Sequence, residues 1–123
     1  MLFLPPIDVY VNQERVTFPD QQPLIAHSRV LVPVRGVFEK MGARVEWTPL
    51  VTAVTIDKDT LHIEMSIADR TVTVNGQTRA IDQGVKVVEG RLLVPIRFIS
   101  ETLGATVRWD PDGRTVHIDA PPR

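Results

Sequence analysis

The chain reads Arg29-Val-Leu-Val-Pro-Val-Arg35, and 62 residues later it reads Arg91-Leu-Leu-Val-Pro-Ile-Arg97. Between the 28-residue windows that begin at the first arginine of each stretch, 13 positions are identical. Unrelated segments of ordinary composition would share only about two. The repetition therefore predicts a duplicated structural unit. Because the shared residues are mainly packing and turn residues, it indicates an architecture rather than a catalytic motif.

A proline and a glycine bracket the segment that follows each apolar run. The residue before a proline is disfavoured in the α region, whereas the fixed φ of proline suits the first turn of a helix. Pro33 and Pro95 are therefore predicted to join a strand to a helix. Gly42 and Gly104 stand where a left-handed C-terminal cap would end that helix.

The two expected helices run from about Pro33 to Met41 and from about Pro95 to Leu103. Apolar residues recur in the first helix at the spacing of one stripe that faces a sheet. The second helix has Ser100 where the first has Phe38, and its own phenylalanine stands at position 98. This difference marks Phe98 as a candidate contact between the two units.

Short alternating apolar segments predict strands before and after each helix. Two of them, Val9–Val11 and Val72–Val74, precede Asn12-Gln13 and Asn75-Gly76, which suit the positive φ of a two-residue hairpin turn. After each helix, a valine and a tryptophan alternate with a charged residue, so both apolar side chains would share one face of a strand.

The first unit has one strand more than the second. Leu61–Met65 alternates apolar and polar residues, and nothing equivalent follows Ile118. We expect Leu2–Leu4 to fill part of the vacant place in the second unit.

These patterns predict an α+β fold of two pseudo-symmetric repeats, each a curled antiparallel sheet packed on one short helix. The repeats would span about 7–65 and 66–119 of a single domain, 1–123, with residues 120–123 as a tail or the start of a linker. A chain of this length can bury roughly two thirds of its unfolded surface, so the repeats are expected to share one core.

The composition excludes several classes of function. The 14 basic and 15 acidic residues give a formal net charge of -1, and the basic residues are scattered, so nucleic acid is not an expected partner. The absence of cysteine excludes disulfides and thiolate metal sites. The apolar start of the chain is too short for a membrane span or a signal peptide, so no membrane insertion is expected.

Two stretches resemble one known family. Gly90-Arg-Leu-Leu-Val-Pro-Ile-Arg-Phe-Ile-Ser-Glu101 and Leu103-Gly-Ala-Thr-Val-Arg-Trp-Asp110 are similar to the motif of the copper amine oxidase N-terminal-like domain. The resemblance covers nearly the whole chain. It implies a stalk of antiparallel sheet around a helix, found in secreted and surface-anchored bacterial proteins. In the oxidase this stalk is separate from the part that holds copper and the quinone cofactor.

The resemblance therefore carries over no catalytic residue and no cofactor. The serines at positions 28, 66 and 100 lack a Gly-x-Ser-x-Gly setting, and no phosphate-binding glycine loop is present. We expect no enzyme activity. The location implied is extracellular or in the cell envelope, with the export signal outside this chain.

A metal site has weak candidates only. His62 and Glu64 would project from one face of a strand, but a divalent metal needs three or four converging donors. His27 and His117 lie in other predicted elements. A solvated sheet face explains His62 and Glu64 more simply.

The repeated arginines allow two interpretations. Arg35 and Arg97 each precede a glutamate by four residues, Glu39 and Glu101, so an ion pair within the helix is available. This structural role is favoured because the position belongs to the repeated scaffold. The alternative is a pair of arginines that binds an anionic glycan or a carboxylate ligand.

The aromatic residues also have two interpretations. Trp47 and Trp109 share a strand face with a valine, which favours burial against the helices, although exposed tryptophans could stack on sugar rings. Tyr10 and Phe98 are the further aromatic candidates for an interaction surface.

The sequence therefore favours a non-catalytic structural or protein-interaction module, a stalk or spacer, in a secreted or cell-envelope bacterial protein. Its contacts would be a protein partner or self-association through open sheet edges. The alternative is a glycan or cell-wall binding module, with a cell-wall polysaccharide as its partner.

Overall fold

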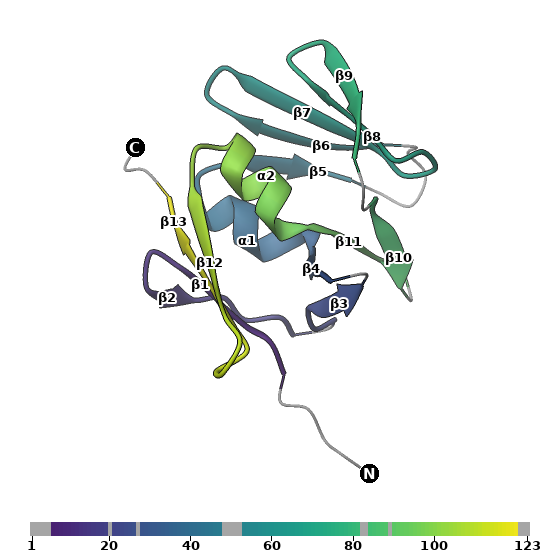
Figure 1. Ribbon diagram of the computed structural model, residues 1–123. Helices are drawn as coiled ribbons and strands as arrows, with labels where there is room; N and C mark the ends of the chain where they lie inside the picture. Colours follow the sequence, from purple (N-terminus) through teal and green to yellow (C-terminus); the bar gives the residue numbers. More distant parts are fainter. Residues whose placement is uncertain are drawn as a thin grey trace.

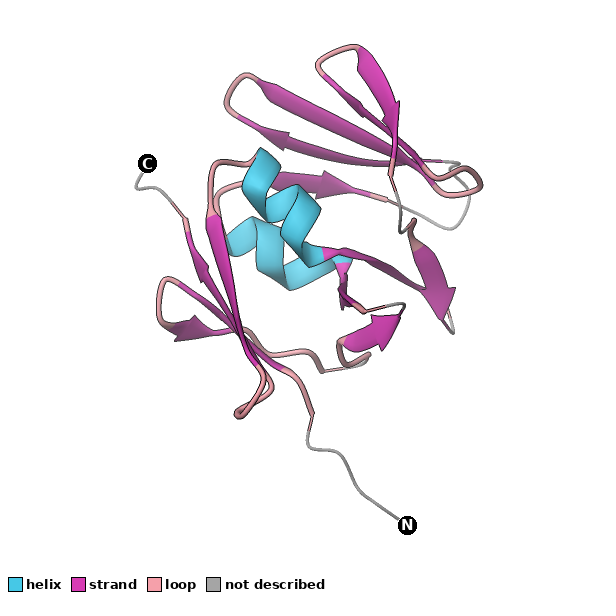
Figure 2. Ribbon diagram, viewed as in Figure 1, coloured by secondary structure: helices cyan, strands magenta, loops and turns pink. Residues whose placement is uncertain are grey.

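The computed structural model describes residues 6–19, 21–26, 28–47, 53–81, 84–88 and 90–120. Within these ranges the chain forms thirteen strands in three sheets, and two short helices lie between the sheets (Figures 1 and 2). All but one of the described strand pairings are antiparallel. This arrangement confirms the predicted α+β class. Neither described helix is long and apolar enough to cross a membrane.

The motif sheet, so called because both copies of the sequence motif enter it, has four antiparallel strands. Their spatial order is β10 (Lys86–Val88), β11 (Arg91–Pro95), β4 (Arg29–Pro33) and β3 (Leu24–Ala26). The two motif strands pair with each other at the centre, where Val94 lies opposite Val32. On either side of that pair, Leu93 faces Pro33 and Pro95 faces Leu31. Adding 62 to the residue number in β4 and subtracting 62 from the residue number in β11 converts each of these two pairings into the other.

The second sheet has five antiparallel strands, which follow one another in space as they do in sequence. They are β5 (Arg44–Glu46), β6 (Ala53–Lys58), β7 (Leu61–Ser66), β8 (Thr71–Val74) and β9 (Gln77–Ala80). The strand predicted at Leu61–Met65 is therefore present as β7, between β6 and β8.

The third sheet joins the two ends of the chain. Its strands lie in the order β12 (Thr106–Asp110), β13 (Thr115–Asp119), β1 (Asp8–Val11) and β2 (Glu14–Arg15). Strand β1 runs parallel to β13, with Val9 opposite Val116 and Val11 opposite Ile118. Strand β1 thus occupies the place beside β13 for which Leu2–Leu4 was predicted. Leu2–Leu4 itself lies outside the described residues.

Helices α1 (Val34–Lys40) and α2 (Ile96–Thr102) follow the two motif prolines, as predicted. Both predicted glycine caps have positive φ, 89° for Gly42 and 92° for Gly104. The N–H group of each donates to the carbonyl of the helix glutamate three residues earlier. Both helices therefore end where the sequence indicated.

The start of α1 differs from the prediction of a continuous helix from Pro33. Arg35 has an extended ψ of 138°, and Gly36 has φ 113° and ψ -55°, so neither residue is helical. Residues with a side chain avoid such backbone angles, which explains why glycine stands here. The Gly36 N–H donates to Glu39 Oε1 at 2.6 Å, and the regular helix begins after this contact.

One hydrophobic cluster joins both helices and all three sheets. Phe38, Val37 and Ile99 from the helices are fully buried in it. Burial of each such side chain stabilises the fold by about 1.5–3 kcal/mol. Residues from both halves of the sequence therefore belong to one core cluster.

Candidate functional site

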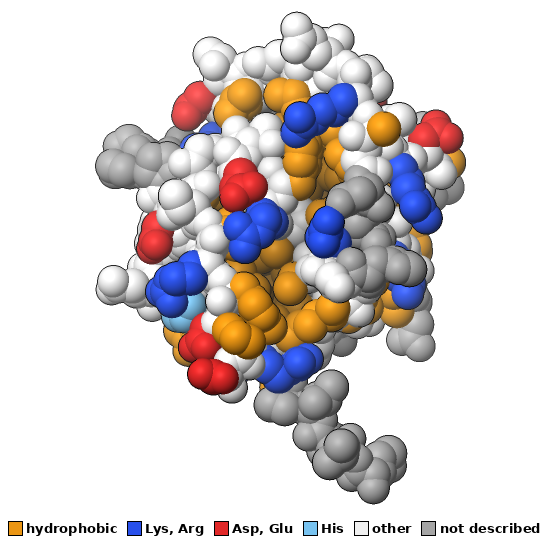
Figure 3. Space-filling model, viewed as in Figure 1, with side chains coloured by type: hydrophobic (Ala, Val, Ile, Leu, Met, Phe, Trp, Pro, Cys, Tyr) orange, Lys and Arg blue, Asp and Glu red, His pale blue; other side chains and the backbone are white. Residues whose placement is uncertain are grey.

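A large groove opens on the face of the molecule shown in Figure 3. Its volume is about 710 Å³. Four described parts of the chain line it: strands β3 and β4, the end of β9, helix α2 with the proline before it, and strands β12 and β13. In the figure, hydrophobic side chains occupy the hollow and basic side chains stand around it. Residues far apart in the sequence thus form one concave surface.

The floor of the large groove is apolar. Ile96 and Val116 belong to the core and reach the groove with little exposed surface. Ile25, on the edge strand β3, is 44% exposed, which is high for a large aliphatic side chain beside a cavity. Trp109 is half-buried and forms the side of the groove near β12. Such exposed apolar surface in a hollow is typical of a binding site.

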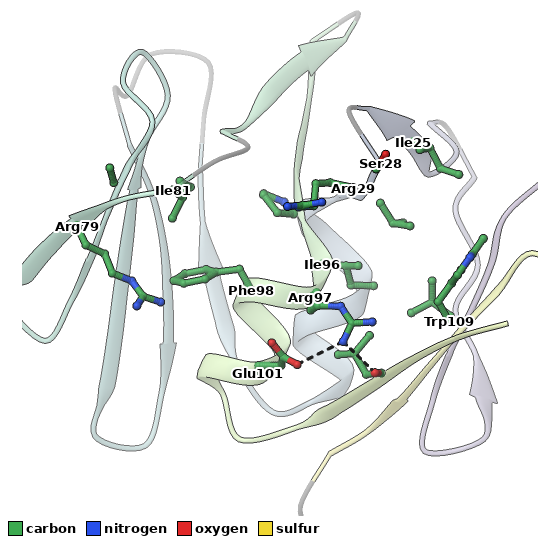
Figure 4. A pocket seen from close by; sticks show the side chains of 15 residues that line it. Ile25, Ser28, Arg29, Arg79, Ile81, Ile96, Arg97, Phe98, Glu101 and Trp109 are labelled. Carbon is green, nitrogen blue, oxygen red and sulfur yellow. Dashed lines mark hydrogen bonds and ion pairs between the residues drawn. The ribbon is translucent and has the colours of Figure 1, made fainter. Parts of the chain in front are cut away.

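Within the described part of the chain, three arginines and one acidic residue line the same groove. They are Arg29, Arg79 and Arg97, and the acid is Glu101. Arg97 Nη1 lies 3.4 Å from Glu101 Oε2 and donates to the carbonyl oxygen of Val107 at 3.2 Å (Figure 4). The ion pair predicted within the second helix is therefore present, and it holds Arg97 at the groove.

Arg79 reaches across from β9 to α2. Its guanidinium lies 4.8 Å from the centre of the Phe98 ring (Figure 4). A cation–π contact at an exposed position contributes about 0.5–1 kcal/mol. This contact links the five-stranded sheet to the second helix and places Phe98 in the groove wall. Both residues belong to the second predicted repeat, 66–119, so this contact does not test the prediction that Phe98 joins the two units.

A small groove of about 350 Å³ lies elsewhere on the molecule, and its lining residues include Arg35, Trp47 and Arg91. Of the eleven described residues that line it, ten stand 62 positions from a residue that lines the large groove. Trp47 corresponds in this way to Trp109, and Arg35 to Arg97. The remaining lining residue is Gln21.

The prediction that both tryptophans are buried is only partly correct. Trp47 and Trp109 pack against the core but keep part of their surface exposed. Each lies in the wall of a groove, which no pattern in its own strand could indicate. The glycan alternative requires a solvent-exposed aromatic residue beside a groove, and these two side chains lie beside grooves but are only partly exposed.

The other interaction candidates lie apart from the large groove. Arg35 Nη1 is 3.8 Å from Glu39 Oε2, so the predicted ion pair of the first helix is also present. Its Nη2 donates to the carbonyl of Trp47 at 3.5 Å. Tyr10 stacks on His117 across the β1–β13 pairing, with ring centres 5.6 Å apart.

The metal candidates His62 and Glu64 lie on strand β7. His62 Nδ1 contacts Asp57 Oδ1 at 2.5 Å on the neighbouring strand β6. Glu64 lies two residues along β7, opposite Thr55 and Thr73. Within the described ranges, no three His, Cys, Asp or Glu side chains are grouped so that they could hold a metal ion. His27 lies outside those ranges.

Sequence reasoning missed Arg29, Arg79 and Ile25 as site residues. Arg79 stands where the first half of the chain has Thr17, so a comparison of the halves beyond the 28-residue windows would have singled it out. Ile25 gave no signal, because its exposure depends on how β3 ends the motif sheet.

Comparisons with known proteins agree with the family resemblance that the motifs indicated. The family model of the copper amine oxidase N-terminal domain matches residues 10–118. A curated relative from Brevibacillus choshinensis, described as a protease inhibitor, is 26% identical over 87 residues. This match covers 71% of the chain but 27% of the relative, so the chain spans about a quarter of that protein. No solved structure gives a significant match.

Proposed function

Because the chain belongs to the copper amine oxidase N-terminal domain family, we propose that it is a non-catalytic protein-interaction module of a secreted or cell-envelope bacterial protein. The large groove is its binding surface. The three sheets and the shared core act as the stalk or spacer that holds this surface in a fixed shape.

One observation carries this proposal: an open groove of about 710 Å³ combines an apolar floor with partly exposed aromatic side chains. Keeping Ile25 44% exposed leaves apolar surface in water, which favours association with another apolar surface. The groove offers Trp109 and Phe98 as anchors, and aromatic anchors dominate the energetics of many protein interfaces.

The matched relative supports a protein partner. It is described as a protease inhibitor, and an inhibitor of that kind acts on a protein. The match covers only part of that relative, so the support concerns the class of partner and not a particular protease.

We further propose that the two halves are related by an approximate two-fold axis that passes between Val32 and Val94. The register of β4 and β11 supports this relation, because it is unchanged when the two strands are exchanged. The matched linings of the two grooves support it as well. Each groove then takes its motif arginine, Arg29 or Arg91, from one half and its tryptophan from the other.

The second candidate function is glycan or cell-wall binding. The presence of Trp109 and Phe98 in one concave surface favours it, since aromatic rings can stack on sugar rings. A carbohydrate array carrying bacterial cell-wall polysaccharides tests this candidate. If a polysaccharide binds the chain and Trp109→Ala abolishes that binding, the glycan-binding function would replace the protein-interaction proposal.

Selection of random ten-residue peptides displayed on phage tests the protein-interaction function. Peptides that bind the chain should bind the Ile25→Asp variant at least tenfold more weakly, because a charge on the groove floor must be desolvated. The matched control is Val87→Asp. Val87 stands 62 positions later, is 49% exposed, and lies on β10 at the other edge of the motif sheet.

The control variant should keep full peptide binding, since Val87 does not line the large groove. Equal losses in both variants, or no loss in either, would contradict the proposed binding surface. A library from which no peptide is enriched would contradict it as well.

A further inference from the structure

We infer that the large groove binds an extended peptide segment in which an acidic residue flanks an apolar one. This inference rests on the proposed protein-interaction function and specifies the chemistry of the partner. The apolar side chain lies on the floor, near Ile25 and Trp109. The carboxylate lies at the arginines of the groove.

Charge complementarity is the first argument. The whole chain has a formal net charge of -1, yet among the described residues three arginines and one glutamate line this groove. With Arg97 paired to Glu101, Arg79 gives the described lining an additional positive charge, on a chain that is slightly negative overall. An interface gains specificity and a faster association rate when its charges oppose those of the partner.

Arg97 and Arg79 differ in whether a nearby group balances their positive charge. Glu101 offsets the charge of Arg97 at 3.4 Å. Arg79 is held over the Phe98 ring, which fixes its position but leaves its full positive charge, since a ring has a quadrupole and no net charge. A guanidinium in a fixed position at the groove wall is well suited to a carboxylate, with which it can form two parallel hydrogen bonds.

The floor argues for a peptide over a sugar. Its lining includes the aliphatic residues Ile25, Val30 and Ile96. Sugar hydroxyls buried against aliphatic side chains lose hydrogen bonds to water without replacement. A leucine, valine or phenylalanine side chain has no such cost and gains from burial.

The borders of the groove argue for an extended segment. Strand β9 ends the five-stranded sheet and β3 ends the motif sheet, and residues of both line the groove. All four residues of β9 are exposed. In the described part of the chain, these strands thus present open backbone edges, which extended peptides can join.

The small groove lacks two of the features that the inference uses. Thr17 stands there in place of Arg79, and Gly36 stands at the position that corresponds to Phe98. The small groove is therefore not expected to bind such a segment.

The test uses the most enriched peptide from the phage selection described above. It is synthesised twice, once unchanged and once with each Asp replaced by Asn and each Glu by Gln, and its affinity for the full chain is measured by calorimetry. The amide version should bind about tenfold more weakly, which corresponds to about 1.4 kcal/mol. Raising the salt concentration from about 0.1 M to 1 M should also lower the affinity of the acidic peptide, because it shortens the Debye length from about 10 Å to about 3 Å.

Arg79→Gln should weaken binding of the acidic peptide about tenfold, the loss expected for one charge-assisted hydrogen bond. Arg108→Gln removes the same charge from an exposed residue of β12 outside the groove, and it should change affinity less than about twofold. The amide peptide should bind Arg79→Gln and the wild type with the same affinity. This last comparison separates a lost carboxylate contact from a general change in the groove.

The inference is overturned if neutral or basic peptides are enriched equally and the amide version binds as well as the acidic one. If Ile25→Asp still abolishes binding in that case, the protein-interaction function stands and only the acidic partner is wrong. If no peptide is enriched, both the function and the inference fail.

Discussion

The two grooves use matching positions of the two halves, yet one is about 710 Å³ and the other about 350 Å³. Both contain a motif arginine, a tryptophan and the residues around a motif proline. They differ where the sequence copies differ, at Thr17 against Arg79 and at Gly36 against Phe98. One scaffold can therefore present a binding surface on one side only.

The phenylalanines show how the difference arises. In α1, Phe38 is fully buried in the shared core. In α2 the corresponding residue is Ser100, and the phenylalanine stands two positions earlier, at the groove. The same type of side chain thus stabilises the fold in one half and shapes the groove in the other.

The largest effect should come from Phe38→Ala. Removal of a fully buried phenylalanine costs about 3–5 kcal/mol of unfolding free energy, and urea denaturation measures it. The matched variant is Ser100→Ala. The Ser100 hydroxyl is buried and has no hydrogen-bond partner among the described residues, so its loss should change stability by less than about 1 kcal/mol. Similar losses in both variants would contradict the different roles of these positions.

Gly36→Ala should have the next largest effect. At φ 113° a Cβ atom is strained, and a cost of about 1–3 kcal/mol is expected. The nearest atom to that Cβ, Val16 Cγ1, would be at 3.6 Å, so backbone strain and not a clash is the cause. Arg35→Ala, at an ordinary φ of -91°, should cost less than about 1 kcal/mol in the same denaturation experiment. An unchanged stability for Gly36→Ala would show that α1 can start as α2 does.

The tryptophans compare the grooves directly. Trp109→Ala should lower the affinity for the selected peptide by about tenfold or more, because an aromatic anchor is lost. Trp47→Ala should leave its affinity within about twofold, because Trp47 lines the small groove. Calorimetry on both variants checks this, with thermal unfolding as the control for folding. The reverse ranking would assign binding to the small groove.

The smallest effects should come from the helix ion pairs. Arg35→Gln and Arg97→Gln each remove a pair whose side chains are about half exposed, so stability should fall by about 0.5 kcal/mol or less in each. Peptide binding should fall only for Arg97→Gln. A loss of binding for Arg35→Gln would break the distinction between the grooves.

Local sequence chemistry predicted the elements that depend on neighbouring residues. Pro33 and Pro95 fixed the strand-to-helix joints because proline restricts its own φ and the residue before it. Gly42 and Gly104 have the predicted left-handed conformation. The ion pairs of Arg35 and Arg97 follow from four-residue spacing on a helix.

Features that depend on distant contacts were not predicted. The parallel pairing of β1 with β13 joins residues more than a hundred positions apart. In the sequence, Gly36 indicates only a residue that weakens a helix, and its non-helical conformation is visible only in its φ of 113°. The half-exposed state of Trp109 and the contact of Arg79 with Phe98 both depend on three sheets meeting around one groove.

Chemical-shift mapping shows directly whether the large groove is the surface that binds the peptide. The selected acidic peptide is titrated into the isotope-labelled chain, and the backbone amide shifts are followed. Shift changes are expected at Ile25, Arg79, Phe98 and Trp109, whereas the amides of Arg35, Trp47 and Arg91 should not shift. Shifts centred on the small groove, or shared equally between the two grooves, would contradict it.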